Sequence, residues 1–214
     1  SSAWLLKDVQ MEYLQEKFAK KGLMILYTAP WPGQGFYTKF PVNSVSDFKG
    51  KKLRIYSTAT QQMGSMLGFN ATILPFAEIP QAFSTGLIEA LFTSPQTGID
   101  IQAWDNTKHF TYAGAIFSKN AVVVTKKAFN ALSKGDQSNM LAAAKKAELR
   151  GWEMSAETTK KQIGILKKNG MSSKNAPDEV ISKMKSIGLE MMKNWRSKAS
   201  PEANAVLDRY LSMR

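Results

Sequence analysis

The sequence predicts an α/β fold that ends in a long helical region. Up to about residue 125, short apolar runs alternate with amphipathic stretches, a spacing that is typical of α/β proteins. Beyond Lys126 the pattern is only helical, and one stretch keeps an apolar face from about Gly135 to Lys168. At 1.5 Å per residue this helix would be about 50 Å long, which is enough to connect two lobes. The 214 residues, 43% of them hydrophobic, suit one large domain or two small ones.

The N-terminal part begins with an amphipathic helix over residues 4–21, and Gly22 is a natural stop. Residues 23–27 form a short apolar run and are predicted to be a buried strand. The next segment, 30–37, combines two prolines and two glycines with aromatic residues and an amide. This composition predicts an irregular loop rather than a helix or an ordinary strand.

The middle of the chain alternates between strands and helices. The run 121–124 is β-branched and is a further predicted strand. The other predicted strands cover 52–56, 71–74, 88–93 and 110–113. The predicted helices cover 58–67, 78–85, 96–104, 128–132 and 135–168. Two more helices are predicted from Asp178 onward, with a break at Ser200-Pro201.

Composition excludes several kinds of site. The absence of cysteine rules out disulfides, thiolate metal sites and a cysteine nucleophile. The single histidine, His109, rules out a histidine-rich metal site, and we expect it to be structural or exposed. No apolar run approaches the roughly 20 residues that cross a bilayer. Because residues 1–4 lack the features of a secretion signal, the sequence leaves open a cytoplasmic protein and a mature or truncated form.

The net charge of +12 has two readings. A basic protein can bind nucleic acid, or it can attract anionic solutes towards a cleft. The lysines are spread along amphipathic helices in the C-terminal half, and no nucleic-acid-binding motif accompanies them. We therefore expect solvated helix faces and no nucleic-acid partner, and we keep a basic nucleic-acid-binding or interaction module as the alternative.

No motif predicts catalysis. The chain has no G-x-S-x-G, no histidine-containing triad, no glycine-rich phosphate loop and no cluster of metal ligands. The sequence thus predicts a binding protein that is not an enzyme and that needs no cofactor.

Several stretches together resemble the solute-binding proteins of TRAP (tripartite ATP-independent periplasmic) transporters, the DctP-like family. The segment 48–50 followed by 53–55 is similar to the family's "DLKGLKIR" strand. Residues 74–82 resemble its "PMPFGEVYTAL" segment, and 84–90 its "QTGVVDG" segment. The long helix after the strand at Val122 resembles the helix that crosses both lobes in the family. The resemblance runs in order from Trp4 to the C-terminus.

The resemblance implies a periplasmic binding protein-like fold with two lobes and a long lobe-spanning helix. The chain corresponds to the C-terminal two thirds of the family, so most of the N-terminal lobe is expected to be missing. It implies the following division: 1–30 as a remnant of the first lobe, 31–119 as the second α/β lobe, 120–150 as a crossing strand and the start of the long helix packing on the first lobe, and 151–214 as C-terminal helices.

The resemblance also implies the protein's partners. The ligand would be a small organic anion with a carboxylate, bound in the periplasm and passed to the TRAP membrane transporter subunits. These subunits use an ion gradient rather than ATP. The long helix could connect the lobes, or it could form a homodimer.

Arg54 is the first candidate for the binding site. It lies on a predicted strand between Leu53 and Ile55, so its side chain points opposite to theirs. A guanidinium presents a rigid fork of donors that matches a carboxylate in two parallel hydrogen bonds. The resemblance implies the same role, because the matching arginine of the family clamps a substrate carboxylate.

Further candidates follow the predicted strands or lie in the predicted loop. The residues after strand 88–93 could bind a substrate oxygen and cover its apolar part, although Ser94 could instead cap a helix before Pro95. The loop could form an aromatic wall with one amide, although Trp31 could equally pack in the core. The candidates are Phe92, Thr93, Ser94, Trp31, Gln34 and Tyr37, then Asn120 by resemblance, and with weaker support Tyr56 and Trp104.

Overall fold

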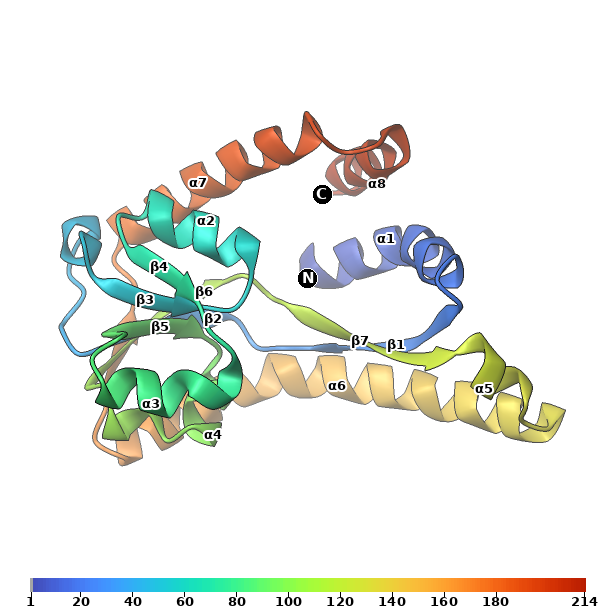
Figure 1. The fold of residues 1–214 in the computed structure, drawn as a ribbon, viewed down its shortest axis with the longest axis horizontal. Coiled ribbons are helices and arrows are strands. Elements are labelled where there is room, and N and C mark those ends of the chain that lie inside the picture. The colour runs from blue at the N-terminus through green and yellow to red at the C-terminus, as the bar shows by residue number, and fades with distance from the viewer. Residues whose placement is uncertain (1) are drawn as a thin grey trace. The chain divides into compact units, whose positions relative to one another are not determined.

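The computed structural model describes residues 2–214, which divide into two compact units. Unit 1 contains the described residues up to Pro30, together with Ser118–Ser155 and Lys193–Arg214. Unit 2 contains Trp31–Phe117 and Ala156–Met192. The ribbon in Figure 1 follows the chain through both units by colour.

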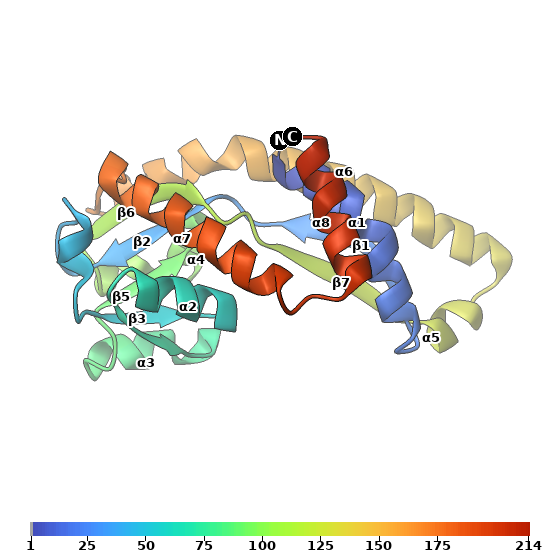
Figure 2. The ribbon, with the colours of Figure 1, turned by 90° about the horizontal axis from the view of Figure 1, so that it is seen from above.

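Unit 1 is built around a two-stranded antiparallel sheet of β1 and β7, with a bulge between Ile25 and Tyr27. Helices α1 and α8 contact each other within this unit (Figure 2). The predicted first helix, the strand after it and the β-branched strand at Val122 are confirmed. The elements are α1 (Ser2–Ala19), β1 (Leu23–Pro30), β7 (Lys119–Thr125), α5 (Lys126–Asn130), the first part of α6 (Lys134–Lys168) and α8 (Pro201–Ser212).

Unit 2 contains a six-stranded mixed sheet with the order β4-β3-β5-β2-β6-β8. The strand β3 runs parallel to its neighbours β4 and β5, whereas β2 is antiparallel to β5 and β6. The strands are β2 (Gln34–Thr38), β3 (Lys52–Ile55), β4 (Asn70–Ile73), β5 (Ala90–Thr93), β6 (His109–Ala115) and β8 (Ser172–Asn175). This sheet, with helices connecting its strands, confirms the predicted α/β fold.

Helices cover both faces of this sheet (Figure 1). On one face, α2 (Thr58–Met66) and α7 (Asp178–Arg196) pack against a buried cluster that contains Phe36 and Leu53. On the other face, α3 (Ile79–Ser84) and the end of α6 pack against a cluster that contains Tyr37 and Leu91. The alternation of side chains along each strand therefore supplies two cores.

Two predictions about local structure were wrong. The predicted loop 30–37 contains most of β2, and residues 172–175 form a strand in a region predicted to be only helical. Gly35 explains the first error, because a Cβ there would lie 2.5 Å from the carbonyl oxygen of Thr111 on β6. Glycine here permits close strand pairing. The polar β8 exists through its pairing with β6 rather than through β propensity.

The predicted helix 96–104 is also shorter than expected. The helix α4 covers Pro95–Asp100, and a separate 3-10 turn covers Ala103–Asp105. Between them Gln102 has a φ of 48°, in the left-handed region. A non-glycine residue in this region interrupts a right-handed helix.

The predicted long helix is confirmed as α6, which has 35 residues and a length of about 52 Å. Its residues up to Ser155 belong to unit 1, and those from Ala156 belong to unit 2. The segment 151–214, predicted as one group of C-terminal helices, is divided: residues 156–192 cluster with unit 2 and residues 193–214 with unit 1. No helix within residues 2–214 is long and apolar enough to cross a membrane.

Candidate solute-binding site

Arg54 projects from β3, which lies between β4 and β5 in the unit 2 sheet. Leu53 and Ile55 point into the cluster under α2 and α7, so Arg54 lies on the opposite face, beside Leu91 of β5. Its side chain is directed by a hydrogen bond from Nε to the carbonyl oxygen of Leu74, at 3.0 Å. Only 4% of Arg54 is exposed. The sheet thus holds this guanidinium in one position.

The charge of Arg54 has no acidic partner. Within residues 2–214, no aspartate or glutamate forms an ion pair with Arg54, and its two terminal nitrogens have no protein hydrogen-bond partner. Burial lowers the pKa of Arg54, and the interaction with Tyr56 opposes this effect. Arginine stays protonated at neutral pH because its ordinary pKa lies far above neutrality. A buried cation of this kind favours the binding of an anion.

One polar side chain, that of Tyr56, lies beside Arg54, and it contacts Gln34 in turn. The ring of Tyr56 has its centroid 5.9 Å from the guanidinium carbon of Arg54. The hydroxyl of Tyr56 donates a hydrogen bond of 2.9 Å to Oε1 of Gln34, which is buried at the start of β2. The structure therefore links three of the predicted residues from two segments of unit 2: Arg54 and Tyr56 in and directly after β3, and Gln34 at the start of β2.

Thr93 and Ser94 lie at the carboxyl end of β5. Thr93 is buried and shares the sheet face of Arg54, two residues beyond Leu91. The Oγ of Ser94 accepts a hydrogen bond of 3.2 Å from the backbone N–H of Thr97. Ser94 is thus the N-cap of α4, the alternative that the sequence left open.

Phe92 and Tyr37 are packed in the two cores. The ring of Phe92 lies 4.8 Å from that of Phe36, and the ring of Tyr37 lies 4.4 Å from that of Phe110. The hydroxyl of Tyr37 donates to the backbone carbonyl of Ser94, at 3.2 Å. Both residues were expected to face a solute, but their side chains are fully buried among other side chains. We assign them to packing.

The remaining candidates are more dispersed. Trp31 is half-buried in the segment before β2, and Trp104 packs against the cluster that contains Tyr37. Asn120 is exposed on β7 and belongs to unit 1. His109 is half-buried in β6. The sequence did not identify the Leu74 carbonyl as a hydrogen-bond partner of Arg54, because every residue has a backbone carbonyl and no side chain marks this one.

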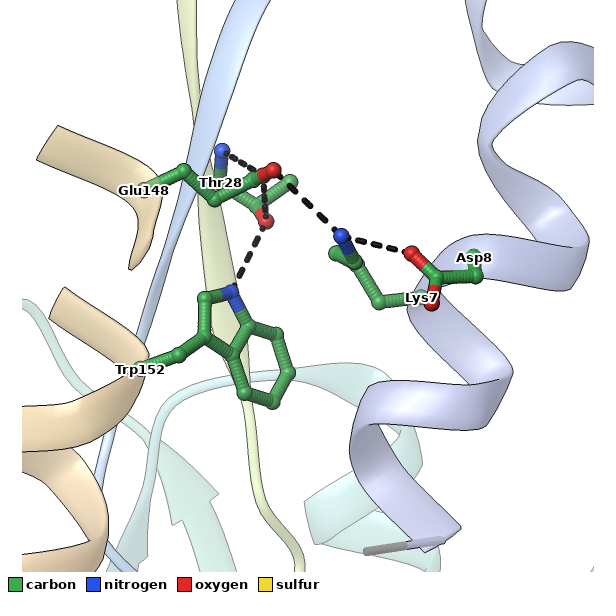
Figure 3. Close-up of polar contacts among 5 residues, drawn as sticks. All are labelled: Lys7, Asp8, Thr28, Glu148 and Trp152. Atoms are coloured by element: carbon green, nitrogen blue, oxygen red, sulfur yellow. Dashed lines mark hydrogen bonds and ion pairs between the residues drawn. The ribbon is translucent and has the colours of Figure 1, made fainter. Parts of the chain in front are cut away.

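A second polar cluster, in unit 1, was not predicted (Figure 3). Glu148 of α6 accepts hydrogen bonds from the backbone N–H and the hydroxyl of Thr28, at 2.9 and 2.7 Å. Its other oxygen lies 3.3 Å from the ammonium group of Lys7, which also pairs with Asp8 at 2.6 Å. Trp152 donates to the Thr28 hydroxyl at 3.3 Å. All acidic and basic groups in this cluster are paired, which indicates a structural role.

Comparison with known proteins identifies the class. A profile of the family described as bacterial extracellular solute-binding protein, family 7 (DctP), matches residues 1–198. The chain belongs to this family, and the resemblance seen in the sequence is confirmed.

Two solved structures show the likeness in detail. An extracytoplasmic solute receptor of Bordetella pertussis that binds pyroglutamic acid (DctP7) is 37% identical, with a TM-score of 0.94 over 98% of this chain and 69% of that chain. A marine metagenome TRAP solute-binding protein specific for pyroglutamate, in complex with co-purified pyroglutamate, is 31% identical. Its TM-score is 0.92 over 99% of this chain and 69% of that chain.

A curated solute-binding protein of Chromohalobacter salexigens is 25% identical over 160 residues, which cover 71% of this chain and 47% of that protein. The chain therefore spans about half the length of this relative. The relatives are solute-binding receptors rather than enzymes. They also support the periplasmic binding protein-like fold that the sequence predicted.

Proposed function

We propose that this chain is the solute-binding part of an extracytoplasmic receptor for a TRAP importer, and that Arg54 holds the carboxylate of a small organic acid. The observation that carries the proposal is a buried guanidinium with no acidic partner within residues 2–214. Leaving such a charge unpaired costs free energy, and a bound carboxylate would offset that cost. The free nitrogens of the fork suit a bidentate contact.

Pyroglutamate is the first solute to test. The two solved relatives described above, which are 37% and 31% identical to this chain, bind it. It has one carboxylate for Arg54 and a neutral lactam in place of a basic amine. Tyr56, which lies beside Arg54, and its hydrogen-bond partner Gln34 carry neutral hydrogen-bonding groups that match a lactam better than an ammonium group. Thr93 is a further candidate for a contact with the solute.

The proposed role includes no catalysis. The receptor would act in the periplasm, bind its solute and present it to the membrane subunits of the transporter. The basic net charge of +12 would help to attract anions to the protein.

The test is titration calorimetry of the chain with pyroglutamate and with its neutral carboxamide. We expect binding of the acid alone. Arg54→Ala should weaken this binding by about a hundredfold, since a charge-assisted bidentate contact contributes about 3 kcal/mol. The matched control is Arg150→Ala, which removes an exposed charge in unit 1 and should leave the affinity unchanged.

Equal binding of acid and carboxamide, or unchanged affinity in Arg54→Ala, would contradict the proposed role of Arg54. A parallel titration with duplex DNA addresses the nucleic-acid alternative. Binding to DNA that falls steeply with salt and is unaffected by Arg54→Ala would support that alternative instead.

A further inference from the structure

A groove of unit 2 runs along the C-terminal half of α6. Its volume is about 500 Å³, which is within the range of small-molecule sites. One wall is a stripe of α6, and the other comes from β6 and β8, where Tyr112 and Asn175 lie opposite each other in the sheet. All nine lining residues belong to unit 2, and none of them is part of the Arg54 site.

Gly164 opens the face of α6 that lines this groove. It shares that face with Lys160, Ile163 and Lys167, because these residues are three to four positions apart along the helix. A Cβ added at Gly164 would meet no atom within 4 Å outside its own stretch of helix. The position is therefore open space rather than a close packing contact.

Two cations lie at the rim of the groove. Lys160 and Lys167 are exposed and stand two helical turns apart, about 10 Å along the axis of α6. Within residues 2–214, neither of them forms an ion pair with an aspartate or glutamate. The lining contains one acidic residue, Glu157, so two lysines and one glutamate give it a net charge of +1. A groove of this charge attracts an anion.

The floor of the groove combines apolar surface with neutral polar groups. Ile163 and Tyr112 both pack on the buried cluster that contains Tyr37. The hydroxyls of Tyr112 and Thr159 are hydrogen-bonded to each other, so β6 and α6 are connected at this point. The Tyr112 ring is held in position, and it offers a fixed surface beside the two lysines.

We propose that this groove is a second binding site, and that it takes a small aromatic carboxylate. The carboxylate would lie between the ammonium groups of Lys160 and Lys167, where its charge would balance that of the lining. The ring would cover Ile163 and Tyr112 and occupy the space that Gly164 leaves open. The proposal does not rest on the role of Arg54.

A polypeptide is a poorer occupant of this groove. A stable protein–protein interface involves roughly 20–30 residues on each side. The groove is lined by nine residues, which suit a ligand of the size of a single ring with one charged group.

An NMR titration of the ¹⁵N-labelled chain with benzoate tests the proposal. The titration is carried out on the Arg54→Ala variant, so that the carboxylate cannot be held by Arg54. We expect saturable shifts of the Gly164 and Asn175 amide signals. Benzamide and acetate should bind at least about tenfold more weakly, because the first lacks the charge and the second lacks the apolar ring.

Two double variants separate this groove from the general basic charge of the chain. Lys160→Gln with Lys167→Gln should weaken benzoate binding by at least about tenfold. The matched control is Lys161→Gln with Lys168→Gln, which removes the same charge from adjacent positions of α6 outside the groove and should leave the affinity unchanged.

A third variant tests the shape of the groove. Gly164→Leu keeps every charge and fills the open space, so it should abolish benzoate binding. A dispersed amide spectrum reports that each variant is folded.

The absence of saturable shifts at Gly164 and Asn175 would overturn the proposal. Equal losses in the two double variants would overturn it as well, since they would indicate general attraction of anions to a basic protein. Shifts produced by an acidic peptide, but not by benzoate, would assign the groove to a protein partner instead. Failure of pyroglutamate to bind the unmodified chain would contradict the proposed function and leave this site unaffected.

Discussion

At the scale of single residues, the burial of Arg54 sets a cost in stability against its proposed role in binding. Its guanidinium is buried with a backbone carbonyl as its hydrogen-bond partner and no acid within residues 2–214. Replacing a buried charge with an apolar side chain of similar volume is often neutral or stabilising. Residues retained at such a cost are commonly retained for function.

We therefore predict that Arg54→Met leaves the free energy of unfolding unchanged or raises it by about 1–2 kcal/mol. The same variant should lose affinity for the solute. Urea denaturation and calorimetry measure the two effects. A loss of stability above about 2 kcal/mol would show that the hydrogen bond to Leu74 is structural in its own right.

Gly98 provides a second prediction at this scale. A Cβ at Gly98 would lie 2.0 Å from the hydroxyl oxygen of Tyr37, whose side chain is fully buried. Gly98→Ala should thus lower the free energy of unfolding by about 1–3 kcal/mol through overpacking. The matched control is Gly164→Ala in α6, where no atom lies within 4 Å of the added Cβ.

In the control, alanine is the better helix former and should stabilise by about 0.5–1 kcal/mol. Opposite signs for the two variants in chemical denaturation are the expected result. Equal effects would mean that Tyr37 moves aside without cost.

At the scale of elements, a comparison of two helix caps tests whether Ser94 serves only to cap α4 or also contacts the solute. Ser94 caps α4 by accepting from Thr97, and Ser57 caps α2 by accepting from Thr60, each at 3.2 Å. Ser94→Ala and Ser57→Ala should each cost about 1 kcal/mol of stability. Their effects on stability are comparable, so Ser57→Ala is the control for solute binding.

We expect both capping variants to bind pyroglutamate with the same affinity, since the Ser94 hydroxyl is engaged with the helix. Calorimetry on the two purified variants gives the comparison. A tenfold or larger loss in Ser94→Ala alone would return Ser94 to the set of solute contacts.

The cluster around Glu148 connects α1, β1 and α6 in unit 1 (Figure 3). Burial by itself raises the pKa of Glu148, but the hydrogen bonds from Thr28 and the charge of Lys7 outweigh it and lower the pKa below its ordinary value of 4.5. A carboxyl whose pKa is lower in the folded state stabilises that state above its unfolded pKa. The contribution disappears as the pH falls through the folded pKa.

Unit 1 should therefore lose stability as the pH drops below about 4.5. Glu148→Gln should already be less stable at pH 7, by about 1 kcal/mol, and should depend less on pH. Denaturation between pH 7 and pH 3 measures this difference. The control is Glu153→Gln, an exposed residue one turn further along α6, which should follow the wild-type curve.

At the scale of the whole molecule, the two units differ in how they are stabilised. Unit 2 has a six-stranded sheet with an apolar cluster on each face. Unit 1 has a two-stranded sheet, and neither of the two buried apolar clusters found within residues 2–214 includes a residue of this unit. Regions with few buried apolar contacts open first under native conditions.

We predict that unit 1 unfolds at a lower urea concentration than unit 2. Hydrogen exchange in increasing urea should show amides of α1 and β7 becoming exposed before those of β2 and β5. A single transition shared by all four elements would contradict this order and would make the two units one cooperative structure.

Much of the fold could be predicted from the sequence. Helices and strands with clear periodicity were predicted, including α6 and the β-branched β7, because their local patterns agree with their final environment. The strand β2 was not predicted, because the prolines and glycines of segment 30–37 are typical of a loop. Gly35 favours a strand only because its lack of a side chain lets β2 pair closely with β6. The polar β8 was missed because pairing with β6, rather than propensity, forms it.

The site was predictable in part. Arg54 was identified from strand alternation together with the family resemblance, and Gln34 and Tyr56 were among the candidates. Phe92 and Tyr37 were also candidates, because an aromatic residue at a strand has the same local pattern whether it faces a core or a ligand. The pairing of strands distinguishes these two environments, and the pairing is a property of segments far apart in the chain.

The sequence by itself determined the class of the molecule, which is an α/β protein with a very long helix and no cysteine chemistry. These properties depend on composition and on local periodicity. Only the tertiary structure decided that Arg54 has no acidic partner within residues 2–214, that Ser94 caps a helix, and that Phe92 and Tyr37 are packed in the two cores. Each of these depends on which distant segments come together, because hydrogen bonds and burial are set by neighbours in space.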